Sequence, residues 1–344
     1  MPAPLAAAID SLLSGRALSF DQAQEVMRQV MAGTVPPPAL AGFLIALRAK
    51  GETVDEIAGL ASAMRAAATR VDAPEGAIDT CGTGGDRSGS FNISTAVALV
   101  AAAAGASVVK HGNRAVSGKT GSADVLEQLG VRADLPAAAA ARCLRECRIC
   151  FCFAPHYHPG MKHAMPARLD LGVRTVFNLL GPLSNPGHVR RQIVGVSNPA
   201  LTATIAEVLL RLNHMHAWVV TGPDGFDEIA LSGPTTVYEV LNGAVKRFTI
   251  DARDLGVEPA DVGRLRADTP EQSAEIIRAV LAGHPGPARD VVAVNAGAAL
   301  LVTGLAADLR DGIDRARRAI DSGAARKTLT AFACLSQELG ATRP

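Results

Sequence analysis

The sequence has few aromatic residues and almost no net charge. Phe, Trp and Tyr make up 3% of the residues and hydrophobic residues 48%, so a core has to be built from Ala, Val, Leu and Ile. The formal net charge is +1, which argues against a protein held to nucleic acid or to a membrane surface by bulk electrostatic attraction. We therefore expect neither nucleic acid nor a membrane as a partner.

Targeting and membrane-spanning segments are lacking as well. The first residues, MPAPLAAAIDSLLSG, contain no basic region of the kind that opens a signal peptide. The most apolar run, residues 96–109, is shorter than the ~20 residues that a membrane-spanning helix needs. We expect a cytoplasmic protein.

Cysteine is scarce except in one short segment. Cys143, Cys147, Cys150 and Cys152 are four of the six cysteines in the chain. The first two are one helical turn apart, and the last two alternate in the strand-like segment ICFCF. A structural zinc site usually contains a second C-x2-C pair, which this segment lacks. We interpret the four side chains as core thiols.

The N-terminal part of the chain has the pattern of a helical domain. Apolar residues recur at three- and four-residue spacing, with polar or proline breaks between the segments. Thr53 with Glu56 fits a capping box, and Ser19 with Gln22 is a plausible helix start. No cluster of catalytic side chains occurs in this part, so we expect residues 1–70 to pack on themselves or on a partner chain. The predicted helices cover residues 5–14, 19–31, 36–49 and 53–68.

From residue 74 onward, short apolar strands alternate with helices. This alternation predicts parallel β-α-β units, whose ligands lie at the carboxyl ends of the strands. We expect an α/β domain over residues 74–344 with a mainly parallel central sheet, ending in helices from residue 269 onward. Helices within residues 160–190 are expected to return to the helical domain. The predicted strands cover residues 77–81, 106–110, 149–153, 192–196 and 217–221.

A glycine-rich turn follows the first predicted strand. Residues 82–86, GTGGD, allow positive φ angles and let backbone N–H groups converge on one point. Residues 92–95, NIST, then open an alanine-rich helix and carry three side chains able to cap its first N–H groups. A strand, a glycine turn and a helix N-terminus together predict an anion site.

A second polar loop follows the next predicted strand. It reads HGNRAVSGKTGS over residues 111–122, and Lys110 stands immediately before it. Two such loops on neighbouring strands suit a ligand with more than one phosphate. The dinucleotide-binding glycine pattern fails because Arg87 replaces its third glycine, and the Walker-type pattern fails because Asn113 replaces its first glycine. The sequence therefore predicts a phosphate site of a different kind.

Two further segments carry candidate side chains. Residues 154–166 contain three histidines without an acidic or cysteine partner, so metal ligation there is the weaker interpretation. We expect this segment to border the site and to supply Lys162 and Arg168 to an anionic substrate, because the planar fork of Arg suits a carboxylate. Asp227 and Glu228 follow a later strand and form an oxygen-rich pair suited to Mg²⁺ held with phosphates, although adjacent acids are more often only solvated.

Taken together, these motifs resemble the anthranilate phosphoribosyltransferase family. The resemblance rests on GTGGD, NIST, KHGNRAVSGKTGSAD, HYHPGMKHAMPAR and DGFDE in this order, and it spans most of the chain. It implies an N-terminal helical domain plus a larger α/β domain, a nucleoside phosphorylase/phosphoribosyltransferase-like fold. It implies a homodimer through the helical domain, Mg²⁺ as cofactor, and anthranilate and 5-phosphoribosyl 1-diphosphate as substrates. The products would be N-(5-phosphoribosyl)anthranilate and diphosphate, in tryptophan biosynthesis.

The resemblance also implies roles for individual residues. Anthranilate would contact Gly82, His111, Asn113 and Arg168, and Mg²⁺ would be bound by Ser94, Asp227 and Glu228. Ser90 stands where the family pattern has threonine, and Gly118-Lys119 departs from a serine-rich loop; both bear on how tightly the loops close. The sugar donor would contact Gly82, Gly85, Asp86, Ser90, Asn92, Ile93, Ser94, Thr95, Lys110, His111, Gly112, Asn113, Arg114, Ala115, Val116, Ser117, Gly118 and Ser122.

Three alternatives remain at this stage. Pyrimidine nucleoside phosphorylases share the implied fold, but we expect them to have another lysine-and-serine phosphate motif and a longer C-terminal part. A nucleic-acid-binding relative would be expected to have a basic surface and eroded motifs, whereas the net charge here is +1. A purely structural dimerisation protein would leave both phosphate loops unexplained.

Overall fold

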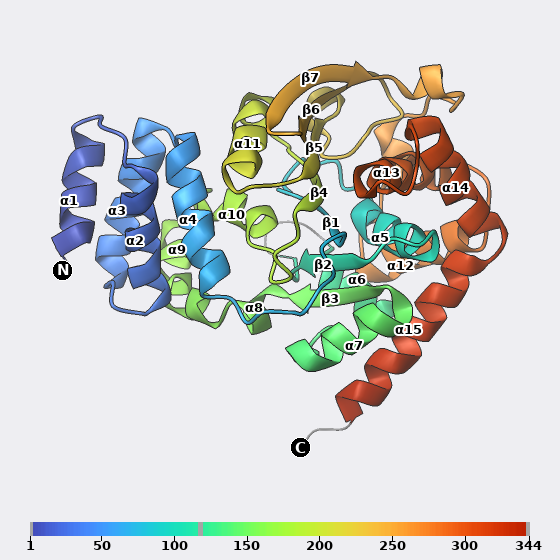
Figure 1. The fold of residues 1–344 in the computed structure, drawn as a ribbon, viewed down its shortest axis with the longest axis horizontal. Helices are drawn as coiled ribbons and strands as arrows, with labels where there is room; N and C mark the ends of the chain where they lie inside the picture. Colours follow the sequence, from blue (N-terminus) through green and yellow to red (C-terminus); the bar gives the residue numbers. More distant parts are fainter. Residues whose placement is uncertain (1–2, 116–119, 342–344) are drawn as a thin grey trace.

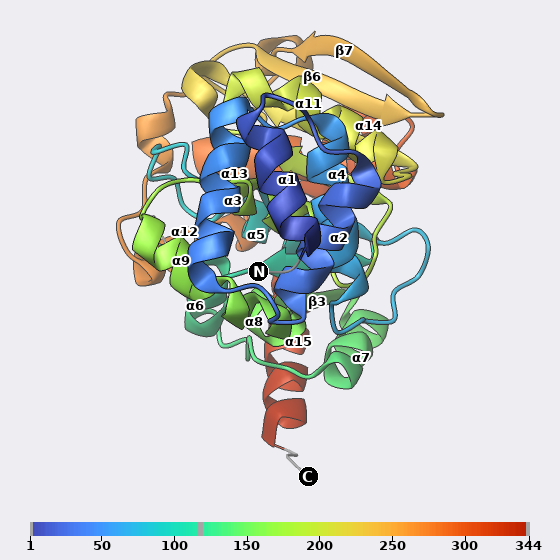
Figure 2. The same cartoon turned by 90° about the vertical axis from the view of Figure 1, so that its left-hand side faces the viewer.

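The structure is a computed structural model that describes residues 3–115 and 120–341. Its N-terminal part consists of α1 (Ala3–Leu13), α2 (Phe20–Met31), α3 (Pro37–Lys50) and α4 (Val54–Ala66). The four helices stand side by side at one end of the molecule (Figures 1 and 2). Each lies within two residues of its predicted bounds, so these predictions are confirmed.

Local capping explains why two of these helices begin where they do. Ser19 and Gln22 form a capping box at the start of α2, and Thr53 and Glu56 form another at α4. The Glu56 carboxylate also accepts hydrogen bonds from the Leu18 N–H and from the Lys50 ammonium, at 2.9 and 2.8 Å. Glu56 is completely buried, so its satisfied charge joins α4 to the end of α3 and to the connection between α1 and α2.

Helices from the middle of the chain pack against this N-terminal group. They are the 3₁₀ helix η1 (Pro159–His163), α9 (Met165–Leu171) and α10 (Phe177–Leu183), and the short helix α8 (Ala154–Tyr157) precedes them in contact with β3. Helix α9 contacts α3, α10 contacts α4, and η1 contacts α2, within one shared hydrophobic core. Gly160 allows the close approach to α2, because a Cβ there would lie 2.7 Å from the Met31 carbonyl oxygen. We call α1–α4 together with residues 154–183 the helical unit.

Within the described residues, seven strands form one sheet in the order β3-β2-β1-β4-β5-β6-β7. Strands β1 to β5 are parallel, while β6 and β7 form an antiparallel hairpin at one edge. The predicted mainly parallel sheet is confirmed. The strands are β1 (Ile78–Gly82), β2 (Val108–Gly112), β3 (Ile149–Phe153), β4 (Arg191–Gly195), β5 (His216–Thr221), β6 (Thr235–Leu241) and β7 (Ala244–Ile250).

One strand prediction was displaced. We expected a strand over residues 106–110, but β2 begins at Val108 and continues through Lys110 and His111 to Gly112. An apolar pattern ends at the first charged side chain, yet Lys110 and His111 are both buried here, with polar partners. The strand therefore carries polar residues of the site inside the sheet.

Helices cover both faces of the sheet. Helices α5 (Ile93–Ala103) and α13 (Pro287–Thr303) contact β1 and its neighbours on one face, and α11 (Pro199–Arg211) contacts β5 and β6 on the other (Figure 1). Helix α11 also contacts α4, so it joins the sheet to the helical unit. The predicted burial of residues 291–304 is confirmed for residues 291–300 and Val302, whereas Gly304, which follows α13, is exposed. Among the described helices, none is both long and apolar enough to cross a membrane.

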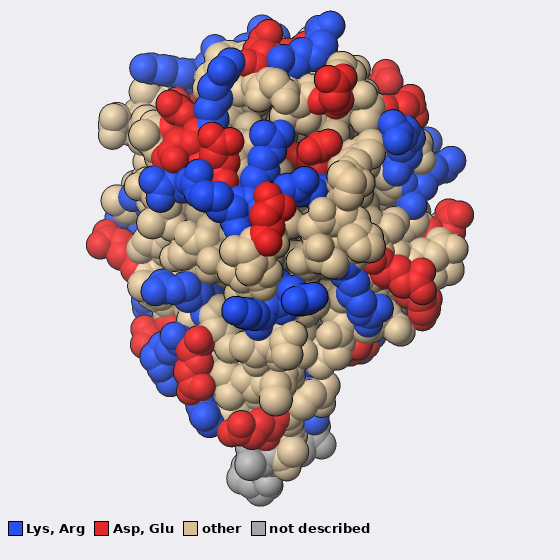
Figure 3. Space-filling model, turned by 90° about the vertical axis from the view of Figure 1, so that its right-hand side faces the viewer, with Lys and Arg blue, Asp and Glu red and all other residues tan. Residues whose placement is uncertain are grey.

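The remaining elements complete the α/β part. The expected helices after residue 269 are confirmed, and Cys143, Cys150 and Cys152 are buried in the core as interpreted, while Cys147 is half-buried. On the face formed by the C-terminal helices, acidic and basic side chains are interspersed (Figure 3). The remaining elements of the α/β part are α6 (Ser122–Gln128), α7 (Ala137–Cys147), η2 (Pro223–Gly225), η3 (Ala252–Leu255), η4 (Val262–Leu265), α12 (Pro270–Leu281), α14 (Leu309–Asp321) and α15 (Ala324–Ala341).

Candidate active site

The candidate site lies where the chain order of the sheet reverses, between β1 and β4. Both strands end in glycine, and Gly82 and Gly195 are paired in register. A Cβ on Gly82 would lie 2.6 Å from Asp227 Oδ2, and one on Gly195 would lie 1.6 Å from the Asp227 carbonyl oxygen. Only glycine at these strand ends leaves room for Asp227. Such a reversal point is where open α/β sheets bind their ligands.

The glycine-rich turn, which we call the first loop (residues 83–89), is held by distant segments. Gly84 and Gly85 have φ angles of 65° and 78°, which only glycine adopts without strain. The Gly84 N–H donates to Asp227 Oδ2 at 3.0 Å. The Gly84 carbonyl oxygen accepts from Ser197 Oγ at 2.9 Å and from Arg174 Nη2 at 3.2 Å. Both the N–H and the carbonyl group of Gly84 are therefore fixed.

Three carboxylates meet beside this loop. Burial raises the pKa of Asp227 to about 7, and the nearby Asp86 charge adds to the shift. Burial also raises the pKa of Glu228 well above its usual range, with a further contribution from Asp227. The Asp86 Oδ1 atom accepts from the Ser88 N–H, whereas Oδ2 is buried and has no hydrogen-bond donor in the described structure. Mutual repulsion and burial thus leave this acidic group in need of a cation.

The residues at this position suit Mg²⁺. The ion prefers oxygen ligands and keeps positions for phosphate and water, so it is commonly bound through one or two carboxylates. Asp227 and Glu228 supply such oxygens, and the Lys110 charge opposes the rise in the pKa of Glu228. Among the described residues, no group of three or more His, Cys, Asp or Glu side chains is arranged to hold a metal ion by itself.

Lys110 lies beneath the acidic group rather than on the surface. Its ammonium donates to the Thr80 carbonyl oxygen at 2.7 Å and to Ser94 Oγ at 3.1 Å, and only 2% of the residue is exposed. Burial lowers the pKa of Lys110, while the nearby charges of Asp79 and Glu228 oppose that shift. Lys110 thus orients Ser94 and balances part of the buried negative charge.

His111 extends from β2 toward the segment before β4. Its Nδ1 lies 3.0 Å from the Gly181 carbonyl oxygen, and its ring centre lies 5.1 Å from that of His158. Burial lowers the pKa of His111 to about 3, so the imidazole is neutral at physiological pH. Its Nε2 is buried without a partner among the described residues, which leaves one ring nitrogen available to a ligand. Asp79, on β1, accepts hydrogen bonds from the His111 N–H and from Asn185 Nδ2. These bonds hold this part of β2 against β1.

The N-terminus of α5 differs from the capping prediction. Asn92 stands at the N-cap position but makes no side-chain cap bond. The Asn92 Oδ1 atom instead accepts from Ser273 Oγ at 3.0 Å, and the Asn92 N–H donates to Ser273 Oγ at 2.9 Å. The prediction that Asn92 caps the helix was wrong, because a partner on α12 competes for the side chain. Ile93 is buried in the core, and Thr95 Oγ1 is buried without a partner within the described part of the chain.

We call the polar loop after β2 the second loop (residues 113–121), and its described residues contact the helix α6 that follows it. Asp124 accepts from the N–H groups of Ala115 and Gly121 and from Arg114 Nη1. Arg114 also donates to Glu127, and these hydrogen bonds raise the pKa of Arg114. Val116, Ser117 and Gly118, which we expected to contact the sugar donor, lie outside the described residues.

The remaining expected residues lie around these loops. A Cβ on Gly112 would lie 2.1 Å from Ser122 Oγ, which itself donates to the Asn113 carbonyl oxygen at 3.3 Å. Ser90 accepts from Ser88 Oγ at 3.1 Å. Arg168, on α9, is half-buried with its guanidinium 5.2 Å from the Phe177 ring centre, and burial lowers its pKa.

Sequence analysis missed Arg174, Ser197 and Asn295. Arg174 and Ser197 contact the first loop, and no motif distinguishes either residue in the sequence. Asn295, buried on α13, accepts from the Ile229 N–H at 2.9 Å and donates to the Ile229 carbonyl oxygen at 3.0 Å. It thereby anchors the backbone immediately after Glu228. A single polar residue within the apolar run of α13 was the available signal.

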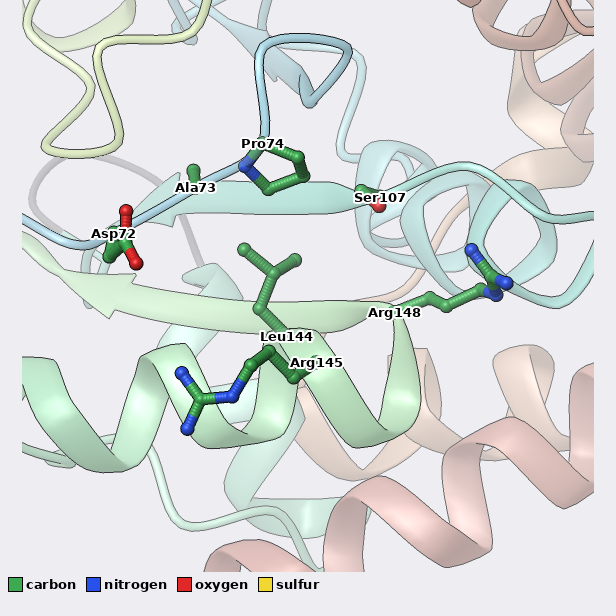
Figure 4. A pocket seen from close by; sticks show the side chains of 7 residues that line it. All are labelled: Asp72, Ala73, Pro74, Ser107, Leu144, Arg145 and Arg148. Atoms are coloured by element: carbon green, nitrogen blue, oxygen red, sulfur yellow. The ribbon is translucent and has the colours of Figure 1, made fainter.

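A surface pocket of about 370 Å³ lies elsewhere in the molecule. Ser107 precedes β2 and Arg148 precedes β3, so this pocket is at the amino ends of the strands (Figure 4). Ligands of parallel sheets bind at the carboxyl ends. The pocket is therefore separate from the candidate site.

Comparison with known proteins identifies the family. Residues 6–68 match the model of the glycosyl transferase family helical bundle domain, and residues 74–326 match that of the glycosyl transferase family a/b domain. The anthranilate phosphoribosyltransferase of Azorhizobium caulinodans is 50% identical over 96% of each chain. That of Thermomicrobium roseum is 49% identical over 96% of this chain and 97% of the relative.

Solved structures agree with this result. The crystal structure of anthranilate phosphoribosyltransferase from Thermus thermophilus is 41% identical, with a TM-score of 0.91 over 96% of this chain and 99% of that one. The Saccharomyces cerevisiae enzyme in complex with PRPP and Mg is 27% identical, with a TM-score of 0.90 over 98% and 99%. By sequence along nearly its full length, and by fold, the chain belongs to the anthranilate phosphoribosyltransferase family.

Proposed function

We propose that the site between β1 and β4 transfers the phosphoribosyl group of 5-phosphoribosyl 1-diphosphate to the amine of anthranilate, the reaction of tryptophan biosynthesis that this family carries out. The observation that carries this assignment is the acidic group of Asp86, Asp227 and Glu228 beside a glycine loop and a helix N-terminus. A cation bound there would turn a repulsive cluster into a receptor for diphosphate. The alternatives are not favoured, since the relatives described above are anthranilate phosphoribosyltransferases.

The diphosphate of the donor would lie over the first loop and the N-terminus of α5. Backbone N–H groups there point toward an anion, and the helix dipole favours negative charge. Ser94, Asp227 and Glu228 would hold Mg²⁺, which supplies positive charge to the departing diphosphate. The second loop and Ser122 would bind the other phosphate, on the neighbouring strand β2.

Anthranilate would bind on the side of the site that the helical unit borders. Arg168 offers a planar guanidinium to the carboxylate, and no carboxylate side chain among the described residues pairs with it. Gly82, His111 and Asn113 would line the space between the anthranilate and the sugar. The neutral His111 ring can then serve as a hydrogen-bond partner without adding charge.

The reaction requires placement and charge stabilisation more than proton transfer. The bond from the anomeric carbon to the diphosphate oxygen breaks, and a bond to the amine nitrogen forms. Because the ring oxygen shares positive charge with that carbon, we expect an oxocarbenium-like transition state. The amine is already neutral at pH 7, so no strong base is needed. The chain contributes by holding the amine in line and by stabilising the leaving diphosphate.

We also propose a homodimer formed through the helical unit. The large apolar side chains with the greatest exposure are Leu13 and Leu169, at 72% and 70%. Ile45, Met165 and Val173 are exposed on the same unit, whose outer helices face the viewer in Figure 2. A patch of this kind on a protein surface indicates a protein interface. A concentration-dependent sedimentation coefficient, lost on Leu13→Glu with Leu169→Glu, would support it; a monomer at all concentrations would oppose it.

The same proposal covers domains and location. Helices within residues 160–190 would complete the helical domain of residues 1–70, and residues 74–344 would form the donor-binding α/β domain. The shared core of α9 and α10 with α3 and α4 supports this division. We place the enzyme in the cytoplasm, because a charged sugar diphosphate does not cross a bilayer readily.

The test follows anthranilate fluorescence after addition of 5-phosphoribosyl 1-diphosphate, with Mg²⁺ and then with EDTA. We expect the signal to decay only when both donor and Mg²⁺ are present. A flat signal with folded protein would contradict the proposed function. The same sample would then be given a pyrimidine nucleoside with phosphate, and separately nucleic acid, to test the alternatives.

A further inference from the structure

Arg174 links two parts of the molecule that lie far apart in sequence. It follows α9 in the helical unit, yet its Nη2 donates to the Gly84 carbonyl oxygen of the first loop at 3.2 Å. The guanidinium also lies over Gly85, since a Cβ there would be 2.5 Å from Arg174 Nη1. Among the described residues no carboxylate forms an ion pair with Arg174. Its contact with the first loop is therefore its principal polar interaction in the structure.

The backbone of Arg174 is itself held by a second arginine. Arg48, on α3, donates from Nη1 to the Arg174 carbonyl oxygen at 2.6 Å. Helix α3 contacts α9, so Arg48 and the segment before Arg174 belong to one packed group. A continuous series of contacts thus runs from α3 through Arg174 to the backbone of Gly84.

Gly84 is the point where the first loop meets the acidic group. Its N–H donates to Asp227 Oδ2, and its carbonyl oxygen accepts from Ser197 and Arg174. Rotation of the backbone at Gly84 would break these hydrogen bonds. The orientation of this backbone decides which way the N–H groups of the loop point, and hence whether they face an anion.

We propose that Arg174 is a positioning residue that couples the helical unit to the first loop. By holding the Gly84 carbonyl oxygen, it keeps the loop in the conformation that receives the diphosphate of the donor, and Arg48 holds Arg174 in place. The inference rests on the proposed function in so far as this loop binds diphosphate. It assigns Arg174 no contact with the reacting atoms.

The geometry explains why arginine suits this role. The planar guanidinium lies over the α-carbon of Gly85 while one of its five N–H donors reaches the neighbouring carbonyl. A lysine ammonium is a compact point charge without this fork. The absence of a side chain at Gly85 is equally necessary, because any Cβ would displace the guanidinium.

The test compares Arg174→Met, Arg174→Lys and Arg48→Met with the wild type. The first readout is hydrogen exchange of residues 83–89 in the protein without substrates, and the second is steady-state kinetics. Loss of one charge-assisted hydrogen bond should raise the KM for 5-phosphoribosyl 1-diphosphate about tenfold in Arg174→Met and speed exchange in the loop. The KM for anthranilate should change less than about twofold. Arg48→Met should shift both readouts in the same direction, by about threefold.

Arg211→Met is the matched control. Arg211, on α11, also joins the α/β part to the helical unit, through Asp55 at 3.0 Å and the Phe20 ring at 4.6 Å, but it does not contact the first loop. The Arg211→Met substitution should leave the hydrogen exchange of residues 83–89 unchanged. Equal effects of Arg211→Met and Arg174→Met would show that any tie between the two parts suffices, and would overturn the proposal.

Two further results separate coupling from charge. If Arg48 acts only through Arg174, adding Arg48→Met to Arg174→Met should have no additional effect, and a fully additive effect would contradict the proposed series of contacts. Arg174→Lys should remain close to Arg174→Met; wild-type values would mean that charge alone matters. Exchange is measured without turnover, so an inactive wild type would overturn the proposed function and still leave the coupling tested.

Discussion

The two loops of the site are built in different ways. The first loop is held by partners 90 or more residues away, such as Arg174, Ser197 and Asp227. The second loop is held by Asp124 and Glu127, which follow it within 13 residues on α6. The first loop therefore takes its shape only when the strands and the helical unit have assembled. The described residues of the second loop are held by a helix that begins where the loop ends.

This contrast matches the role that we propose for the first loop. A loop fixed from several directions keeps its N–H groups oriented, which suits charge stabilisation at a departing group. Variants of the anchoring residues can disturb the two kinds of attachment separately.

The largest effect is expected from the acidic anchor of the first loop. Asp227→Asn keeps the shape of the side chain but removes the charge that would hold Mg²⁺. We expect kcat/KM for the donor to fall by about 10²- to 10³-fold at saturating Mg²⁺, as measured by anthranilate fluorescence. Asp224→Asn changes an exposed carboxylate three residues earlier and should leave the rate unchanged. Similar losses in both variants would mean that the local fold, not the charge, is responsible.

A smaller effect is expected from Asn295, the buried residue that holds the backbone at Ile229. Asn295→Ala would leave the N–H and carbonyl groups of Ile229 without partners, which should lower the free energy of unfolding by about 2 kcal/mol. It should also raise the half-saturating Mg²⁺ concentration about tenfold, since the backbone after Glu228 loses its anchor.

Ser336→Ala provides the comparison for Asn295→Ala. Ser336 is buried on α15 and accepts from the Arg132 N–H at 2.9 Å, far along the chain from the site. The Ser336→Ala substitution should lower the free energy of unfolding without changing the half-saturating Mg²⁺ concentration. An unchanged Mg²⁺ requirement in a folded Asn295→Ala protein would show that the anchor is only structural.

The second loop should respond more mildly. Asp124→Ala frees the N–H groups of Ala115 and Gly121 and leaves Arg114 with Glu127 as its carboxylate partner. Because these contacts are partly exposed, we expect about a fivefold rise in the KM for the donor with little change in kcat. Asp134→Ala breaks a 2.7 Å pair with Arg132 and serves as the control. A loss as large as that of Asp227→Asn would erase the distinction between the two loops.

An effect on stability rather than on activity is expected from His158, whose ring centre lies 5.1 Å from that of His111. Burial lowers the pKa of His158 to about 4, from 6.5 when exposed. The unfolded chain then binds more protons below pH 6.5, so stability is lost as the pH falls through this window. At pH 5 this amounts to roughly 2 kcal/mol.

His158→Gln tests that prediction by removing the titrating group. The drop in melting temperature between pH 8 and pH 5 should be smaller in the variant than in the wild type by a few degrees. Equal drops would show that His158 is protonated in the folded protein.

The pKa of His111, also lowered by burial, predicts that its ring signals in NMR spectra do not titrate between pH 5 and 8.

Sequence alone determined the features that depend on near neighbours. The helices of residues 3–66 and their capping boxes follow from apolar spacing and from residues three positions apart. The glycine turns and the acidic pair were likewise visible, because each is a short motif. Five motifs in order also identified the family, and the comparisons confirm it.

Tertiary structure decided what depends on residues distant in the chain. Asn92 looked like a helix cap, but Ser273 competes for its side chain from 181 residues away. Lys110 was expected beside the polar loop at the end of its strand, but its buried ammonium donates to Thr80 and Ser94. Arg174 had no motif at all, and its contact with Gly84 exists only because the helical unit packs beside the sheet. Local patterns specify what a segment can form, whereas the partner of a polar side chain is settled by which segments the fold brings together.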